Sequence, residues 1–535
     1  MFDANCYRYP SRRNLIYGQK GMVATSQPLA AEAGLEILKK GGNAVDAAIA
    51  TAACLTVVEP TSNGIGGDAF ALVWMKDKLH GLNASGPAPG LLSLETLKSL
   101  KLDEIPKFGW VPVTVPGTPA AWAELSKRFG ALSLLECLEP AIRYAKEGYP
   151  VSPTLAKNWK RAVQIFKKAL TEPVFEAWFQ TFAPDGDAPT AGRIWSSPTH
   201  AETLKRIGET NSRTFYTGEI ADAIDAHAQA TGGFVRKTDL EQFRVEWVDP
   251  IQVSYKGFDV WEIPPNGQGI VALMALKTLE KDTFSHRDEV ACWHHQIESI
   301  KLAFADAKQH LADSRAMRVS VESMLHSDYA TKRRSQINPD YAQCYNSGLP
   351  DRGGTVYLAT ADRFGNMVSY IQSNYMGFGS GVVVPGTGIA LHNRGHNFNV
   401  IPGHPNCIEP GKRPFHTIIP GFLTKNGHAI GPFGVMGGFM QPQGHLQMMM
   451  NTIDFGMNPQ EAIDAPRWQW MEGQTVWVEP STPLHLVDAL SAMGHDIRIQ
   501  HEIGQFGRAQ AIWLQEDGVL CGGTEGRTDG HIAVW

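Results

Sequence analysis

Residues 351–362 read DRGGTVYLATAD, and a second run, MVSYIQS at 367–373, follows after the connection RFGN. Both runs are rich in β-branched and aromatic residues, which favour strands, and the short polar connection between them is typical of a hairpin. Thr355 opens the first run, directly after a pair of glycines. The stretch therefore predicts a β-hairpin whose first strand begins at Thr355.

The residues before this hairpin favour helix. From 119 to 283 the pattern is mainly helical, with a strand-like interlude at 253–265, and a long helix is expected over 288–313. Residues 316–352 carry many polar and turn-forming side chains with little periodicity, which predicts an exposed loop leading to Thr355.

Near the N-terminus, Asn43 followed by Asp46 predicts a capped helix, and its alanine-rich body is typical of a helix buried on most sides. After the hairpin the pattern changes to strand-like runs at 414–425, 428–435, 489–500 and 509–515, listed here in chain order. Sheets covered by helices result, so the expected fold class is α+β. With 535 residues, the chain exceeds the usual single-core limit of about 250–300, which favours two domains or one large layered domain.

Charge and composition exclude several classes of protein. The 48 basic and 54 acidic residues give a net charge of -6, which offers no footprint for nucleic acid or an anionic membrane. The longest apolar stretch, 44–58, contains Asp46 and is too short to span a bilayer, and the first residues lack the apolar core of a secretory signal. We therefore expect a cytoplasmic protein that binds neither membranes nor nucleic acids.

Metal and cofactor motifs are weak. The seven cysteines are scattered without a CxxC pair, which indicates neither a disulfide framework nor a zinc knuckle. His392 and His396 have a metal-compatible spacing but no accompanying ligand pair, and the glycines of 377–381 lack the βαβ context of a dinucleotide loop. His294 is interpreted as structural. No metal or cofactor is expected.

A lone threonine at a strand start is ordinarily a packing residue, so the surrounding motifs must decide its role. They are DRGGTVYLATAD, GNMVSYIQSNYMGFGSG (365–381) and GPFGVMGGFMQPQG (431–444), with GMVATSQPLAAEAGLEILKKGGNAVDAAIATAACLTVVEPTSNGIGGDAF (21–70) at the other end of the chain. With these blocks the sequence resembles the gamma-glutamyltranspeptidase family of N-terminal nucleophile hydrolases, especially its glutathione hydrolase-like, class IV cephalosporin acylase and oxamate amidohydrolase branch.

This resemblance implies a four-layer αββα fold and a precursor that cuts itself between Gly354 and Thr355. The products would be a large subunit, 1–354, mostly helical, and a small subunit, 355–535, that stay together as partners. The freed α-amine, with an ordinary pKa of about 7.7–8.0, can serve as the base for the Thr355 hydroxyl. A strained bond is easier at Gly354, which has no side chain.

The family pattern also implies roles for other positions. Ser373 falls where a hydroxyl residue hydrogen-bonds the nucleophile, and Gly437 and Gly438 match the pair whose N–H groups form the oxyanion hole. The positions that recognise the γ-glutamyl group differ from the family pattern, and they fall at Ser85, Tyr375, Arg394, Asn397, His416 and Thr417.

The altered pocket loses carboxylate partners for an ammonium and gains Arg394, with Arg413 and His416 close in sequence. A guanidinium holds a carboxylate by two parallel hydrogen bonds.

The expected function is cleavage of γ-glutamyl-type or related small-molecule acyl amides through an acyl-enzyme. The alternatives are an amidase for an anionic acyl group without an α-amine, of the oxamate or glutaryl-cephalosporin type, and a processing-dead binding protein. Transfer to an acceptor amine and a homodimer of heterodimers stay open.

Overall fold

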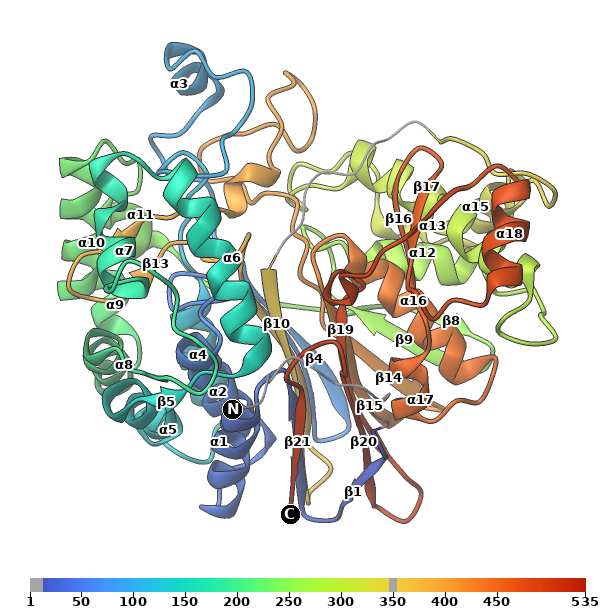
Figure 1. Cartoon of the computed structure of the whole chain (residues 1–535), viewed down its shortest axis with the longest axis horizontal. Helices are drawn as coiled ribbons and strands as arrows, with labels where there is room; N and C mark the ends of the chain where they lie inside the picture. The colour runs from blue at the N-terminus through green and yellow to red at the C-terminus, as the bar shows by residue number, and fades with distance from the viewer. Residues whose placement is uncertain (1–12, 346–353) are drawn as a thin grey trace.

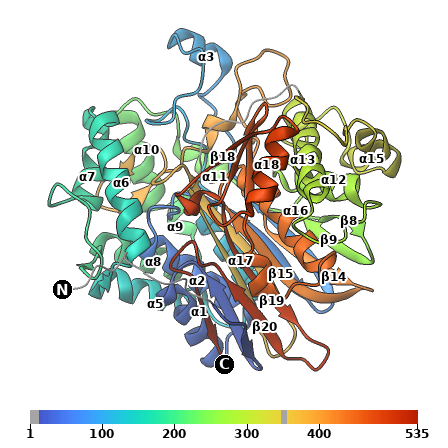
Figure 2. The same ribbon diagram turned by 45° about the vertical axis from the view of Figure 1, so that its right-hand side comes forward.

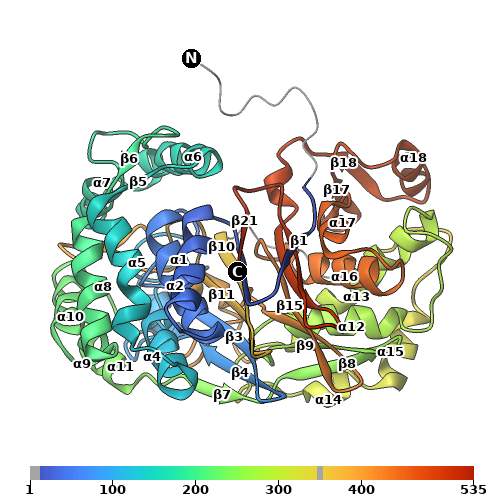
Figure 3. The ribbon, with the colours of Figure 1, turned by 90° about the horizontal axis from the view of Figure 1, so that it is seen from below.

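The computed structural model describes residues 13–345 and 354–535. Two sheets lie face to face, and each carries helices on its outer side, so the molecule is a four-layer αββα sandwich (Figures 1 and 3). In Figure 3 the layers succeed one another from the helices α1, α2 and α5 to the helices α12, α13 and α16. The fold class expected from the sequence is confirmed.

The first sheet contains the hairpin that the sequence predicts at Thr355. Its strand order is β21 (His531–Val534), β2 (Gly21–Thr25), β10 (Gly354–Asp362), β11 (Met367–Tyr375), β3 (Asp68–Met75), β4 (Lys78–Ala84) and β7 (Glu246–Val248). All neighbours pair antiparallel. Strands from both ends of the chain thus flank the hairpin, which places β10 in the interior of the sheet.

The second sheet packs on the first across an apolar layer that includes Phe70, Tyr357 and Phe422. Its order is β1 (Ile16–Gly18), β20 (Leu520–Thr524), β19 (Arg508–Leu514), β15 (His428–Met436), β14 (Gly421–Lys425), β9 (Phe258–Glu262) and β8 (Ile251–Tyr255). Burial of such large apolar side chains contributes about 1.5–3 kcal/mol each, so this layer is a principal source of stability.

The first sheet is covered by α1 (Pro28–Lys39), α2 (Ala44–Val58) and α4 (Thr118–Phe129). The other helices of the N-terminal half are α3 (Leu94–Ser99), α5 (Leu134–Glu147), α6 (Pro153–Ala169), α7 (Glu176–Phe182), α8 (Pro198–Thr210), α9 (Arg213–Thr217), α10 (Glu219–Ala230) and α11 (Lys237–Gln242). Every residue of α2 is buried, and Asn43 and Asp46 form its capping box, as expected.

The second sheet is covered by α12 (Gly269–Leu279), α13 (Val290–His310) and α16 (Met440–Ile453), which Figure 2 shows against β9, β14 and β15. Around them lie α14 (Val321–Met324), α15 (Ser327–Arg334), α17 (Pro459–Asp464), α18 (Leu484–Ala492) and the small sheet of β16 (Trp468–Glu472), β17 (Thr475–Val478) and β18 (Asp496–Ile499). Two short pairs, β5 (Tyr149–Pro150) with β6 (Ile194–Trp195) and β12 (Val383–Val384) with β13 (Ile389–Ala390), complete the strands of the described residues.

Three local predictions need correction. The expected loop at 316–352 contains α14 and α15, because Ser320 and His326 accept hydrogen bonds at their N-termini and their exposed polar faces show no apolar periodicity. Residues 489–500 are the end of α18 and then β18, with a turn at Gly494 (φ 93°), instead of one strand. In 414–425 the strand begins only at Gly421. Residues 346–352 lie outside the described residues.

Side-chain contacts outside the hairpin also join the parts of the chain before and after Thr355. The Nδ1 of His294, on α13, lies 2.9 Å from the Nε2 of His495. The Nε2 of His294 donates to the Asn338 carbonyl. The neighbouring Glu298 pairs with buried Lys301. Glu298 lies close enough to both histidines to share a metal ion with them. His294 joins α13 to the segments around Asn338 and His495. Among the described helices, none is both long and apolar enough to cross a membrane.

Candidate active site

Thr355 lies at an irregularity of the hairpin. In the register, Gly354 pairs with Tyr375 and Val356 with Gln372, so Ser373 and Asn374 together face Thr355. Such a bulge re-aims side chains locally and is frequent beside functional sites. Thr355 is fully buried, and its hydroxyl donates to the Ser373 hydroxyl over 3.3 Å.

The Thr355 hydroxyl has a second neighbour on helix α16, which covers the opposite sheet. Gln441, in the first turn of α16, directs its Nε2 toward Thr355 Oγ1 at 3.5 Å, and its Oε1 accepts from the Ile419 N–H. Ser373 Oγ in turn accepts from the Tyr375 N–H over 2.7 Å. Groups from the first sheet and from α16 therefore fix the position of this hydroxyl.

Gly437 and Gly438 form the turn between β15 and α16. Their φ angles, 141° and 60°, lie in the region that favours glycine, so side chains here would strain the turn. The Gly438 carbonyl accepts from Gln268 Nε2 over 2.9 Å, and the same nitrogen donates to the Thr417 carbonyl over 2.6 Å. Gln268 thus joins this glycine turn to the segment that carries His416 and Thr417.

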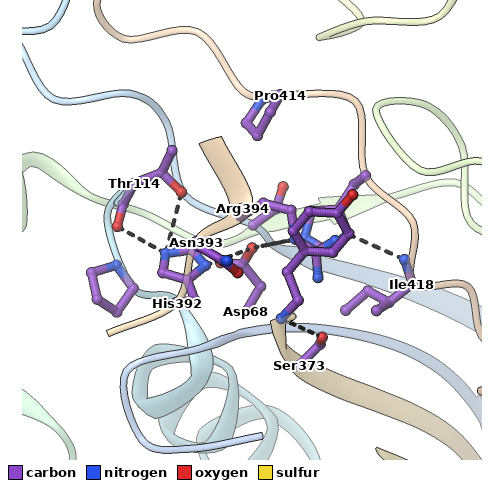
Figure 4. A network of polar contacts seen from close by, with 12 residues as sticks. Asp68, Thr114, Ser373, His392, Asn393, Arg394, Pro414 and Ile418 are labelled. Carbon is purple, nitrogen blue, oxygen red and sulfur yellow. Dashed lines mark hydrogen bonds and ion pairs between the residues drawn. The ribbon is translucent and has the colours of Figure 1, made fainter. Parts of the chain in front are cut away.

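A buried carboxylate, Asp68, occupies the centre of a charged cluster beside Ser373, its partner in the register of β3 and β11. Its Oδ2 lies 2.7 Å from His416 Nε2, 3.3 Å from His392 Nδ1 and 3.5 Å from Arg394 Nε. Figure 4 shows Asp68 between His392 and Arg394. All four side chains have no solvent exposure, so their charges interact in a medium of low dielectric constant.

Arg394 is held on three sides. Its Nη1 donates to Thr417 Oγ1 over 2.7 Å, its Nε faces Asp68, and its guanidinium carbon lies 4.4 Å from the centroid of the Tyr375 ring. Burial lowers the pKa of Arg394 to about 10, with Asp68 opposing the shift, so the group stays charged at neutral pH. Its Nη2 has no hydrogen-bond partner among residues 13–345 and 354–535.

His416 is neutral. Its Nδ1 accepts from the Ile418 N–H, which leaves the single proton on Nε2, and this proton is donated to Asp68. Burial, together with the charge of Arg394, lowers the pKa of His416 to about 3. For Asp68, burial opposes ionisation, but His392 and His416 outweigh it and hold the pKa of the carboxyl well below its ordinary value.

Three further residues that the sequence analysis placed in the pocket, Ser85, Asn397 and Arg413, make their hydrogen bonds and ion pairs with groups outside the Asp68 cluster. Ser85 donates to Asn83 Oδ1, and Asn397 donates to the Phe415 carbonyl. Arg413 pairs with Glu246 at 2.8 Å and donates from Nε to the Ser85 carbonyl. The charge of Arg413 is therefore balanced by Glu246, outside the Asp68 cluster.

The arrangement combines a buried hydroxyl, a glycine turn at the N-terminus of a helix, and a cationic side chain whose Nη2 finds no hydrogen-bond partner in the part of the chain that the structure describes. The first two suit nucleophilic acyl transfer, because developing negative charge can be held by backbone N–H groups at such a turn. The third suits recognition of an anion. In comparison with known proteins, the gamma-glutamyltranspeptidase family matches residues 30–535.

The chain belongs to the gamma-glutamyltranspeptidase family. A glutathione hydrolase-like YwrD proenzyme of Bacillus subtilis is 34% identical over 96% of this chain and 98% of its own length. Acylase ACY 1 proenzyme of a Pseudomonas species is 33% identical over 99% of this chain and 95% of its own length. The crystal structure of a cephalosporin acylase from Bacillus halodurans superimposes with a TM-score of 0.97 at 59% identity, over 100% of this chain and 99% of the other.

Membership of the gamma-glutamyltranspeptidase family establishes an enzyme, an N-terminal nucleophile hydrolase that cleaves amides. Several of its site residues escaped the sequence analysis, namely Asp68, Gln268, His392 and Gln441. Asp68 ends the quoted GIGGD motif and His392 drew attention only for its spacing to His396, so no spacing signal connects them. Asp68 and His392 lie side by side because the register of β3 and β11 places Asp68 beside Ser373, and because the folded loop after β13 brings His392 to it.

Proposed function

We propose that this family member cuts its own Gly354–Thr355 bond and then uses Thr355 to hydrolyse amides whose acyl group ends in a carboxylate and lacks an α-ammonium. The observation that carries the acyl preference is Arg394, a fully buried cation with a donor, Nη2, that no residue of 13–345 or 354–535 satisfies. A glutaryl amide is the simplest substrate of this class.

In the processing step, Thr355 Oγ attacks the Gly354 carbonyl carbon, the bond to the Thr355 nitrogen breaks, and that nitrogen takes the proton. Water then hydrolyses the resulting ester, which leaves a carboxylate at Gly354 and a free hydroxyl and α-amine on Thr355. The contact with Ser373 at 3.3 Å supports this step, because it holds the attacking oxygen in one direction.

In turnover, the α-amine takes the hydroxyl proton as Thr355 Oγ attacks the substrate carbonyl. Gly437 and Gly438 would stabilise the oxyanion through their N–H groups, the leaving amine takes the proton, and water hydrolyses the acyl-enzyme. Gln268 supports this role because it fixes the Gly438 carbonyl and so the orientation of the turn.

One similar structure is a cephalosporin acylase and one similar precursor is an acylase, which supports cleavage of an acyl amide other than a γ-glutamyl one. A second candidate is γ-glutamyl hydrolysis, suggested by the glutathione hydrolase-like relative. Asp68 Oδ1 favours it, since this buried oxygen accepts no hydrogen bond within residues 13–345 and 354–535 and could face an α-ammonium.

A matched set of three anilides separates these candidates. Glutaryl p-nitroanilide and γ-glutamyl p-nitroanilide differ only by the α-ammonium, and pentanoyl p-nitroanilide lacks both charges. We expect kcat/KM to be highest for the glutaryl compound, by about tenfold or more over each of the others. Equal or higher values for the γ-glutamyl compound would reject the acyl preference, and absence of a chain starting TVYLATAD in active protein would reject self-processing.

A further inference from the structure

Two histidines contact the same oxygen of Asp68, but their second nitrogens face opposite kinds of group. His416 Nδ1 faces a donor, the Ile418 N–H, so this ring carries one proton. His392 Nε2 lies 2.8 Å from the Thr114 carbonyl, which can only accept, and its Nδ1 lies 3.3 Å from Asp68 Oδ2, a charge contact that lacks hydrogen-bond geometry. Both nitrogens of His392 therefore have reason to carry protons.

This difference changes the charge of the acyl pocket. If His392 were neutral, Asp68 would cancel Arg394 and the cluster would have no net charge. With His392 doubly protonated, the two cations exceed the one carboxylate, so the buried cluster has one positive charge in excess. A buried excess charge is costly unless a counter-ion approaches, and the free Nη2 of Arg394 marks where one could bind.

We propose that His392 is a positioning and specificity-determining residue, which, as an imidazolium, occupies Asp68 and thereby leaves the charge of Arg394 for the carboxylate of the acyl group. This inference rests on the proposed function and deepens it, because it explains why a pocket that contains a carboxylate still selects an anion. His392 does not touch the reacting atoms. Its effect belongs in the binding of the acyl group and not in the chemical step.

The surroundings of His392 contain few competing charges. Asp68 on β3 and Arg394 after β13 are the ionised neighbours, and His416 before β14 is neutral. Tyr216 on α9, which interacts with Asp68, is kept neutral because burial raises its pKa well above the ordinary value. The Thr114 hydroxyl, 3.2 Å from His392 Nε2, adds a neutral contact. The second proton of His392 therefore decides the net charge of this cluster.

The test is His392→Gln, which keeps a side chain of similar reach with an N–H donor but cannot carry a charge. We expect KM for glutaryl p-nitroanilide to rise about tenfold, with kcat and the KM for pentanoyl p-nitroanilide changed less than about twofold. His404→Gln is the matched control, since that ring contacts Asn399, Asn406 and the Lys308 carbonyl and leaves Asp68 untouched. It should behave as the parent enzyme.

The ratio of the glutaryl KM to the pentanoyl KM provides the second measurement, because it cancels any change that affects both substrates alike. It should be low in the parent and about tenfold higher in His392→Gln. Equal losses for both substrates, or an unchanged ratio, would overturn the inference. Failure of the parent to cleave itself or to prefer the glutaryl compound would instead reject the proposed function.

Discussion

The two ends of the site hold their groups by different physical means. Around Thr355 the contacts are neutral hydrogen bonds: its hydroxyl meets the Ser373 hydroxyl and the Gln441 amide, and Gln268 holds the glycine turn. Around Asp68 the groups are fully buried, and the charges of Asp68 and Arg394 interact with each other and with two histidines. The first region needs geometry and the second needs charge balance, so substitutions should affect them in different ways.

The largest effect is expected in the neutral region. Thr355→Ala removes the attacking oxygen, so the chain should stay uncut and turnover of every anilide should fall by at least about a thousandfold. Denaturing electrophoresis and the anilide assay measure both results.

Thr360→Ala is the control for this experiment, because Thr360 lies in the same strand and its buried hydroxyl donates to the Ala44 carbonyl. That variant should still yield two fragments. The assignment of the nucleophile would be wrong if Thr355→Ala were still cleaved at the Gly354–Thr355 bond. It would also be wrong if Thr360→Ala stayed uncut while Thr355→Ala was cleaved.

In the charged region we expect a smaller and selective loss. Arg394→Met removes the free donor and the cation, so kcat/KM for the glutaryl anilide should fall about a hundredfold while that for the pentanoyl anilide changes little. Arg394→Lys keeps the charge but loses the paired donors and should lie between the two.

A parallel loss with both anilides would contradict this selectivity and would indicate that Arg394 supports the fold of the site. Tm from calorimetry distinguishes the cases. A large fall in Tm would accompany loss of the fold of the site, whereas a selective loss should leave Tm little changed, because Asp68 keeps its contacts with His392 and His416.

The same division explains what the sequence could predict. The hairpin, the capped helix at Asn43 and the four-layer fold rest on local patterns and on motifs contiguous in the chain, and these are confirmed. The acyl pocket draws Asp68, His392 and His416 from three separate segments, and their protonation depends on which backbone group each ring nitrogen meets. No periodicity or spacing in the sequence indicates that these residues lie together. The sequence alone could therefore predict Arg394 as a binding residue, but not the charged groups beside it.

The smallest effect is expected at Arg413, which the sequence analysis grouped with Arg394. Its guanidinium pairs with Glu246, a side chain that is 49% exposed, and donates to the Ser85 carbonyl, so its charge is already balanced outside the Asp68 cluster. Arg413→Gln should change the ratio of glutaryl to pentanoyl KM by less than about twofold and lower Tm by a few degrees, about what loss of such contacts costs. A selective loss of glutaryl binding as large as that of Arg394→Met would instead place both arginines in the acyl pocket, and charge balance by Glu246 would then be no guide to which cation binds substrate.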